Sequence, residues 1–230
     1  MFALAIVITV AAIFAFSMFA DYAADPGRLW HDVHHDRNGH FNFALDLALS
    51  LRNFDVVEFL LHLERARVWP PVHGLALASV LTIGGIDVRL AILPSLIGWV
   101  ATIALTFLIA RQLLADRRGG ITGGALAVTF ALASPAFRLI TADVMLEGLG
   151  AALTALCFYA YLRVRDEPVS ERWWGVLALS LTALFFEKSN YWLLTVEAIE
   201  SDPRFARVVA EPMSGLGANV TIWQRQRQRE

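Results

Sequence analysis

Charged side chains stand near the ends of several apolar runs, where a membrane surface would expose their chemistry. Asp36 precedes an amphipathic stretch, so its carboxylate is placed to meet both a membrane-bound donor and an acceptor. Asp143 and Glu147 are four residues apart, a spacing that puts both on one face of a helix. Arg138 precedes them, and Lys188 lies in a later apolar run, where it can bind a phosphate. Ionisable groups at membrane depth are costly, so these residues predict a functional site.

Each of these residues also has a structural interpretation. Asp36 could cap a helix or lie in a solvated loop, and the two later acids could simply lie among lipid headgroups. Lys188 directly follows Glu187, so these two side chains could form an ion pair at the end of a span. The residues alone leave both interpretations open.

All six histidines lie between residues 31 and 73, and residues 31–36 read His-Asp-Val-His-His-Asp. Imidazoles and carboxylates this close together can converge on one cation. His34 and His35, with His31 beside them, are therefore candidate metal ligands, and a divalent metal ion is the candidate cofactor. The alternative is a solvated polar loop. The string also resembles the histidine boxes of membrane di-iron desaturases and hydroxylases, although no histidine follows His73 to supply further boxes.

Composition identifies the chain as a membrane protein. Of its 230 residues 57% are hydrophobic and 17% are charged, a balance too apolar for a soluble globule to cover itself. Four long runs contain no charged residue: Phe2 to Ala20, Leu90 to Ala110, Ile121 to Phe137 and Gly148 to Leu162. Crossing a bilayer takes about 20 apolar residues, so the first two runs suffice and the others need flanking polar residues. The sequence predicts an all-α integral membrane protein.

We expect about five transmembrane helices in a membrane domain of residues 1–196, at 2–20, 90–110, 121–141, 144–163 and 173–196. Arginines cluster at 111–118 and at 163–172, which marks both segments as cytoplasmic by the positive-inside rule. Residues 21–89 and the span ends that carry Asp143, Glu147 and Lys188 then face outward, across what we expect to be the plasma (inner) membrane. Residues 2–20 could instead be a cleaved signal peptide, although no basic segment precedes them.

The outer segment, residues 21–89, has the patterns of helices that lie along the membrane surface. Polar residues recur every three or four positions, at Asn42, Asp46, Ser50 and Asn53. Asp55 and Glu58 then have the spacing of a capping box that opens a second helix through about residue 67, and Trp69-Pro70-Pro71 ends it. Residues 73–86 are apolar but too few to cross a bilayer. We expect residues 39–86 to form interfacial helices.

The order of these features resembles a known family. An outer aspartate before an amphipathic helix is followed by Trp69-Pro70-Pro71-Val72-His73-Gly74, Asp87-Val88-Arg89-Leu90, a span ending at Arg111, a span ending at Ser134-Pro135, and then Arg138 and Asp143. Over about residues 30–192 this order is similar to the GT-C membrane glycosyltransferases. Within them it is most similar to the protein O-mannosyltransferase and aminoarabinose-transferase-like group, family 39.

This resemblance implies transfer of a sugar from a polyprenyl-phosphate donor to a lipid, glycan or protein acceptor, with inversion, at the extracytoplasmic face. Asp36 would match the essential acid of the first outer loop, and Asp143 the acid of the second. A carboxylate can act as base on the acceptor hydroxyl, while cations stabilise the leaving phosphate. The substrate-binding residues would be Lys188, Arg138, Glu147 and Arg89. Arg37 follows Asp36 where the group usually has an acidic or aromatic residue, which weakens a metal role for an adjacent acid pair.

Residues 197–230 are predicted to be a short polar tail of α/β or β structure, with strands near 205–211 and 219–224. Several middle spans of the family are absent, so we expect a truncated or internally deleted form whose activity is open. Two other functions also stay open: a metal-dependent lipid-modifying enzyme that uses His31, His34 and His35, and a non-catalytic membrane pseudoenzyme. Membrane lipid is an expected partner, and nucleic acid is not.

Overall fold

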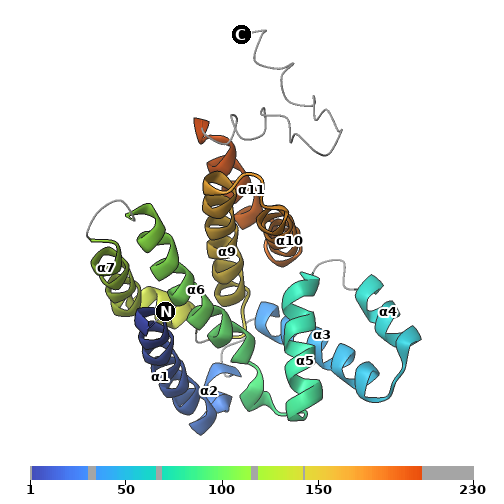
Figure 1. Cartoon of the computed structure of the whole chain (residues 1–230). Helices are drawn as coiled ribbons and strands as arrows, with labels where there is room; N and C mark the ends of the chain where they lie inside the picture. Colours follow the sequence, from blue (N-terminus) through green and yellow to red (C-terminus); the bar gives the residue numbers. More distant parts are fainter. Residues whose placement is uncertain (1, 31–34, 66–68, 115–118, 142, 204–230) are drawn as a thin grey trace, which may run out of the picture.

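The computed structural model describes residues 2–30, 35–65, 69–114, 119–141 and 143–203, and every regular element in these ranges is helical (Figure 1). In chain order the helices are α1 (Phe2–Ala24), α2 (Pro26–Trp30), α3 (His35–Arg52), α4 (Val56–Arg65), α5 (Pro71–Gly84), the 3-10 turn η1 (Val88–Leu90), α6 (Leu93–Leu113), α7 (Gly120–Ala133), α8 (Pro135–Thr141), α9 (Glu147–Asp166), α10 (Glu171–Glu187) and α11 (Ser189–Glu200). The predicted all-α class is confirmed over this part of the chain.

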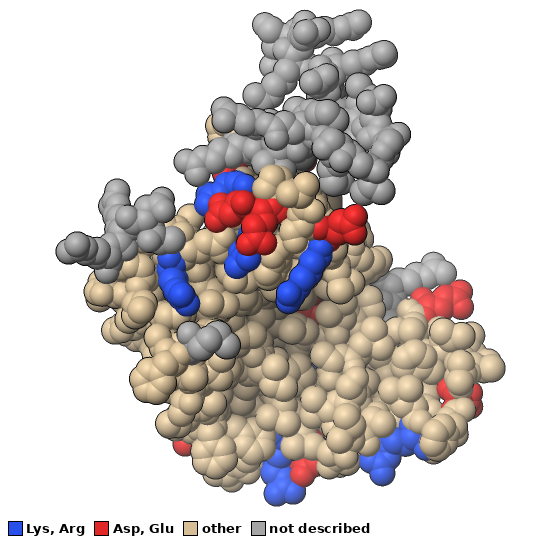
Figure 2. Space-filling model, in the orientation of Figure 1, with Lys and Arg blue, Asp and Glu red and all other residues tan. Residues whose placement is uncertain are grey.

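Two helical segments are long and apolar enough to cross a membrane, namely α1 and Val88–Leu113, in which η1 leads into α6. Together α7 and α8 meet the same standard as a pair bent by 66°. Figure 2 shows charged side chains near the upper end of this face and along its lower edge, with a broad uncharged surface between them. The helices are therefore suited to a membrane-embedded protein.

The central helix of the bundle is α6, which contacts α1, α7 and α9 (Figure 1). Glycines allow α6 and α9 to touch along their backbones: a Cβ atom on Gly98 would lie 2.4 Å from the carbonyl oxygen of Gly148. One on Gly148 would lie 2.5 Å from the carbonyl oxygen of Ser95, whose hydroxyl donates to the carbonyl oxygen of Met145 at 3.0 Å. Small residues permit this close helix packing. The contact fixes the beginning of α9.

Helices α3, α4 and α5 pack mainly on one another, and α5 also contacts α6 and α10. The Asp55 half of the predicted capping box is confirmed, because its carboxylate accepts from the backbone N–H of Glu58 at 2.9 Å and α4 begins at Val56. The reciprocal bond is absent, because the backbone N–H of Asp55 donates to the carbonyl oxygen of Ser50 at 2.9 Å. Pro71 is the first residue of α5, a position that suits proline because its fixed φ is helical and the missing N–H has no partner there. These caps set where each helix of the segment begins.

The span predicted at residues 173–196, which Glu187 and Lys188 interrupt in the sequence, is divided between two helices. α10 ends at Glu187, Lys188 has an extended backbone with φ −158° and ψ 91°, and α11 begins at Ser189. Lys188 contacts Glu147 at the start of α9, and Tyr161 donates to Asp202 near the other end, so both contacts join residues 41 apart. α11 therefore runs parallel to α9, and the chain reverses at Lys188.

Two other predicted spans need correction. Residues 121–141 form the bent pair α7 and α8 rather than one straight helix. The span predicted from residue 144 begins as a helix only at Glu147, so Asp143 precedes α9 and does not share a helical face with Glu147. The predicted strands of the tail, at 205–211 and 219–224, lie outside the described residues.

Candidate functional site

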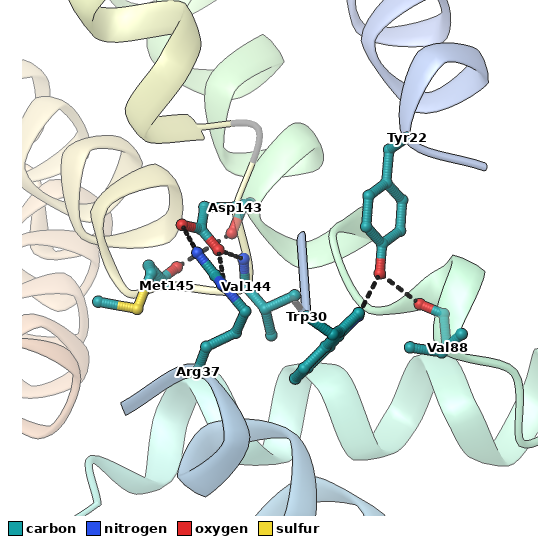
Figure 3. Close-up of polar contacts among 8 residues, drawn as sticks. Tyr22, Trp30, Arg37, Val88, Asp143, Val144 and Met145 are labelled. Atoms are coloured by element: carbon teal, nitrogen blue, oxygen red, sulfur yellow. Dashed lines mark hydrogen bonds and ion pairs between the residues drawn. The ribbon is translucent and has the colours of Figure 1, made fainter. Parts of the chain in front are cut away.

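A buried ion pair joins the beginning of α3 to the segment before α9 (Figure 3). Nε and Nη2 of Arg37 donate to the two carboxylate oxygens of Asp143 at 2.7 and 2.8 Å, and the Arg37 side chain is 8% exposed. The Asp143 carboxylate also accepts from the backbone N–H of Val144 at 2.6 Å. A two-point guanidinium–carboxylate contact fixes both groups in orientation as well as in distance. Asp143 is thus held by an arginine 106 residues away.

Polar contacts from α1 and α2 lie beside this pair in Figure 3. The Tyr22 hydroxyl donates to the carbonyl oxygen of Val88 at 2.7 Å, and the indole N–H of Trp30 donates to that hydroxyl at 3.4 Å. These bonds connect the end of α1 to η1, just before α6. These bonds help to position η1 beside the ion pair, and they involve no charged side chain.

A second ion pair joins the beginning of α9 to the reversal between α10 and α11. Nζ of Lys188 donates to Oε1 of Glu147 at 2.5 Å, and the two side chains are 17% and 25% exposed. Of the interpretations left open for Lys188, the ion pair with Glu187 does not form, and Lys188 pairs with Glu147 instead.

Behind these pairs lies a buried cluster of unpartnered polar groups. His73 on α5 and Glu187 at the end of α10 are both fully buried, with 3.6 Å between Nδ1 and Oε1. Neither side chain has a hydrogen-bond partner among the described residues. The ring of His40, which is 3% exposed, lies 5.4 Å from that of His73 between centroids, and its Nδ1 also lacks a partner within the described part of the chain. Trp69 covers the other side of His40, with ring centroids 4.8 Å apart.

Burial and, to a smaller extent, the neighbouring His73 lower the pKa of His40 from 6.5 to about 4. The carboxylates of Asp36 and Glu147 act in the opposite direction. His40 is therefore a neutral imidazole at neutral pH, with both a donor and an acceptor nitrogen.

Asp36 lies in the first turn of α3 with an exposed side chain. It directly precedes Arg37 and is one turn before His40, on which it acts electrostatically. The predicted acid is thus exposed and adjacent to Arg37, which holds Asp143, and it acts on the same histidine as Glu147 and Lys188 do.

Two predicted substrate-binding residues have other neighbours. Arg89 forms an exposed ion pair with Asp87, at 2.6 Å, and this guanidinium lowers the pKa of the Asp87 carboxyl. Arg138 on α8 lies over the ring of Phe14 on α1, 5.8 Å from its centroid. Neither contact joins these arginines to the two ion pairs of the site.

The side chains of the predicted histidine metal site lie outside the described part of the chain. His31 and His34 lie outside the described residues, and His35 is described only as the first residue of α3. Among the residues that the structure describes, no three histidine, cysteine or acidic side chains already converge on one point.

An open groove of about 430 Å³ lies beside the Glu147–Lys188 pair, between α6, α9 and α11. Its lining is mainly apolar: Ile109, Ala151, Thr154, Ala155, Phe158, Tyr191, Leu194 and Thr195. Tyr191 belongs to both regions, because Nζ of Lys188 lies 4.5 Å from its ring centroid. An apolar groove therefore begins at a cation.

Sequence patterns missed His40, His73 and Glu187 as a group. The histidines were visible only as members of a histidine-rich segment, and Glu187 only as a charge inside an apolar run. That charge was the one available signal, because a carboxylate at the end of the uncharged run of residues 173–186 needs a partner if it lies at membrane depth.

Comparison with known proteins gives no relative: no family model, no curated protein and no solved structure matches this chain. The site must therefore be interpreted from its own geometry.

Proposed function

We propose that this chain is a membrane glycosyltransferase that moves a sugar from a polyprenyl-phosphate donor to an acceptor hydroxyl with inversion. The observation that carries the proposal is the juxtaposition of two carboxylate–cation pairs, Arg37–Asp143 and Glu147–Lys188, beside the exposed Asp36. They come from three segments that are distant in the sequence, namely residues 36–37, residues 143–147 and Lys188. A polar site assembled in this way, in a chain with apolar helices, is suited to a substrate that is part lipid and part sugar.

The donor phosphate would bind at Lys188. The ammonium group has three hydrogen-bond donors, and Glu147 accepts one of them, which leaves donors for a phosphate oxygen. The hydrocarbon chain of the donor would lie in the groove that begins at Tyr191. Headgroup and chain would then occupy adjacent polar and apolar surfaces, as the chemistry of the donor requires.

Asp36 would act as the base. Its carboxylate takes the proton of the acceptor hydroxyl, the hydroxyl oxygen forms a bond to the anomeric carbon, and the bond from that carbon to the phosphate oxygen breaks. The polyprenyl phosphate leaves with the bonding electrons, and its charge is stabilised by Lys188. Asp143 is held by Arg37, so its role would be to orient the site rather than to take the proton.

The architecture that goes with this function is a GT-C-like membrane domain, with the site facing outside the cytoplasm. Of the five crossings expected, α1 and Val88–Leu113 have the required length and apolarity by themselves. The bent pair α7–α8, α9 and α10 would supply the other three. In this proposal α11 returns beside α9 rather than completing the fifth crossing.

The test uses the full chain in lipid nanodiscs with a labelled polyprenyl-phosphate-linked hexose or pentose, and follows release of polyprenyl phosphate in the presence of lipid and glycan acceptors. Asp36→Asn should reduce turnover by about 10²–10⁴-fold, the usual contribution of a general base. Asp46→Asn is the matched control, because Asp46 is an exposed acid of the same helix.

Turnover by Asp36→Asn at the rate of the unmodified chain would refute the assigned base. No turnover of either class of donor by the unmodified chain would refute the transferase function, and would favour the pseudoenzyme.

A further inference from the structure

We propose that His73 and Glu187, with His40 as a third ligand, form a divalent-cation site of the zinc class inside the junction of α3, α5 and α10. This site differs from the histidine string at residues 31–36. It does not depend on the proposed glycosyl transfer.

The first argument is the burial of polar atoms without partners. Both nitrogens of His73, both carboxylate oxygens of Glu187 and Nδ1 of His40 are buried and have no hydrogen bond within the described part of the chain. His73 and Glu187 are 0% exposed and His40 is 3% exposed. Each such group costs about 1–3 kcal/mol unless it is compensated. Groups of this kind on three different helices indicate a ligand that satisfies them together.

The second argument is the distance between the two facing atoms. At 3.6 Å, Nδ1 of His73 and Oε1 of Glu187 are too far apart for a good hydrogen bond. Zinc lies about 2.0–2.2 Å from nitrogen and oxygen ligands, so two ligands at a tetrahedral angle are about 3.4 Å apart. The observed separation is within a few tenths of an ångström of that value, so a cation fits between the two atoms with little movement.

The third argument is the kind of ligands and the charge around them. Two imidazoles with one carboxylate are a donor set that suits zinc and similar metals. The carboxylates of Asp36 and Glu147 act on His40 in the direction that favours a cation and Lys188 in the opposite direction, while the Glu187 carboxylate faces His73. The surroundings favour a cation.

Binding of a metal ion at this site requires the His40 side chain to move. The three side chains do not yet converge on one point among the residues described, so His40 has to turn its ring toward the facing pair. Trp69 packs against the other face of the site, and a Cβ atom on Gly39 would lie 2.1 Å from its ring. This tight cover excludes water from the ligands and limits the turn to a rotation of the imidazole.

The test measures metal directly rather than activity. The full chain, purified in detergent with a chelator, is dialysed against Zn²⁺ or Co²⁺, and bound metal is counted by mass spectrometry. We expect about one ion per chain, and a tetrahedral Co²⁺ absorption band in the visible range. Glu187→Gln and His73→Gln should each lose the ion and the band, while Asp36→Asn should keep both. The last result separates this site from the proposed catalytic base.

His62→Gln is the matched control. His62 also lies beside two acids, 3.4 Å from Glu58 and 3.9 Å from Asp46, but its side chain is 21% exposed rather than fully buried. Loss of the ion from His62→Gln, or from a His34→Gln/His35→Gln variant, with retention in Glu187→Gln, would overturn the proposal. So would the absence of stoichiometric metal in the unmodified chain. If His73→Gln fails to fold, Glu187→Gln, which keeps the shape of the side chain, decides the question together with His40→Gln.

Discussion

The two ends of α9 carry charged residues of different kinds. At the end near Asp166 the ion pairs are local and partly exposed: Arg163 pairs with Glu167 four residues away, and Arg165 with Asp166 next to it. At the end near Glu147 the pairs join distant segments, 41 and 106 residues apart, and bury most of their side chains. At the Asp166 end the long-range contacts have uncharged donors: Gln112 donates to Asp166, and Tyr161 donates to Asp202.

This difference teaches how to tell a solvated charge from part of a built site. A local pair on one helix forms as soon as the helix forms and has little effect on the rest of the fold. A buried pair between distant segments requires the tertiary structure, and it is strongly destabilising to break. By this criterion the Glu147 end holds the candidate site, and the Asp166 end is a polar cap of the bundle.

The largest expected effect comes from removing one partner of the buried Arg37–Asp143 ion pair. Arg37→Ala leaves the Asp143 carboxylate without its guanidinium partner, so we expect a loss of about 3–5 kcal/mol in the free energy of unfolding. Denaturant titration in mixed micelles, followed by circular dichroism, measures it.

The double variant Arg37→Met/Asp143→Leu is the control for this prediction. It removes both charges, so it should be more stable than Arg37→Ala. If Arg37→Ala unfolds at the same denaturant concentration as the unmodified chain, the contrast between the two ends of α9 is false.

Sequence patterns predict contacts between residues that are close in the chain, but they do not predict contacts between distant segments. The cap of α4 was predictable because Asp55 and Glu58 are three residues apart and the bond between them is local. The pairing of Arg37 with Asp143 was not, because helical periodicity gives the face of a residue but never its partner. The sequence did bring Asp143, Glu147 and Lys188 to one region, through the alternation of apolar runs.

The reversal at Lys188 shows a second limit. No glycine or proline marks it, and the apolar residues continue on both sides, so hydropathy extended the helix through the break. Tertiary contacts decide the outcome: Lys188 binds Glu147, while Glu187 faces His73. Hydropathy measures how long a segment is apolar, and it cannot detect a turn stabilised by partners elsewhere in the chain.

The second largest effect is a pH dependence at the Glu147 end. The pKa of His40 falls from 6.5 to about 4 on folding, so between these values the unfolded chain binds more protons than the folded one. The contribution of His40 to stability is therefore complete above about pH 6.5 and is lost as the pH falls to about 4. Its full size is about 3 kcal/mol.

Unfolding at a series of pH values in the unmodified chain and in His40→Gln measures this contribution, because the difference between the two curves removes the titration of the carboxyl groups. Parallel curves from pH 7 to pH 4 would show that His40 is not buried as a neutral group.

A smaller effect should come from packing at the same end. Gly148→Ala would put a Cβ atom 2.5 Å from the Ser95 carbonyl oxygen, so α6 and α9 must separate. We expect a loss of about 1–3 kcal/mol. Gly175→Ala is the control on α10, because its Cβ would meet nothing within 4 Å, and alanine should stabilise that helix by about 0.5–1 kcal/mol. Equal effects of the two substitutions in thermal unfolding would contradict the close contact.

The smallest effect is expected at the local, partly exposed ion pair of Arg163 and Glu167 near the Asp166 end of α9. Glu167→Gln removes the acid that pairs with Arg163, but the Glu167 side chain is 49% exposed and the pair is local to one helix turn. Water replaces the lost contact, and Arg163 keeps its position over the Trp173 ring, 4.8 Å from the centroid. The free energy of unfolding should therefore change by no more than about 0.5 kcal/mol, a value typical of exposed pairs. The same titration as for Arg37→Ala measures it. A loss as large as that of Arg37→Ala would mean that the Asp166 end of α9 is also built by its ion pairs, and that chain separation does not distinguish a site from a polar cap.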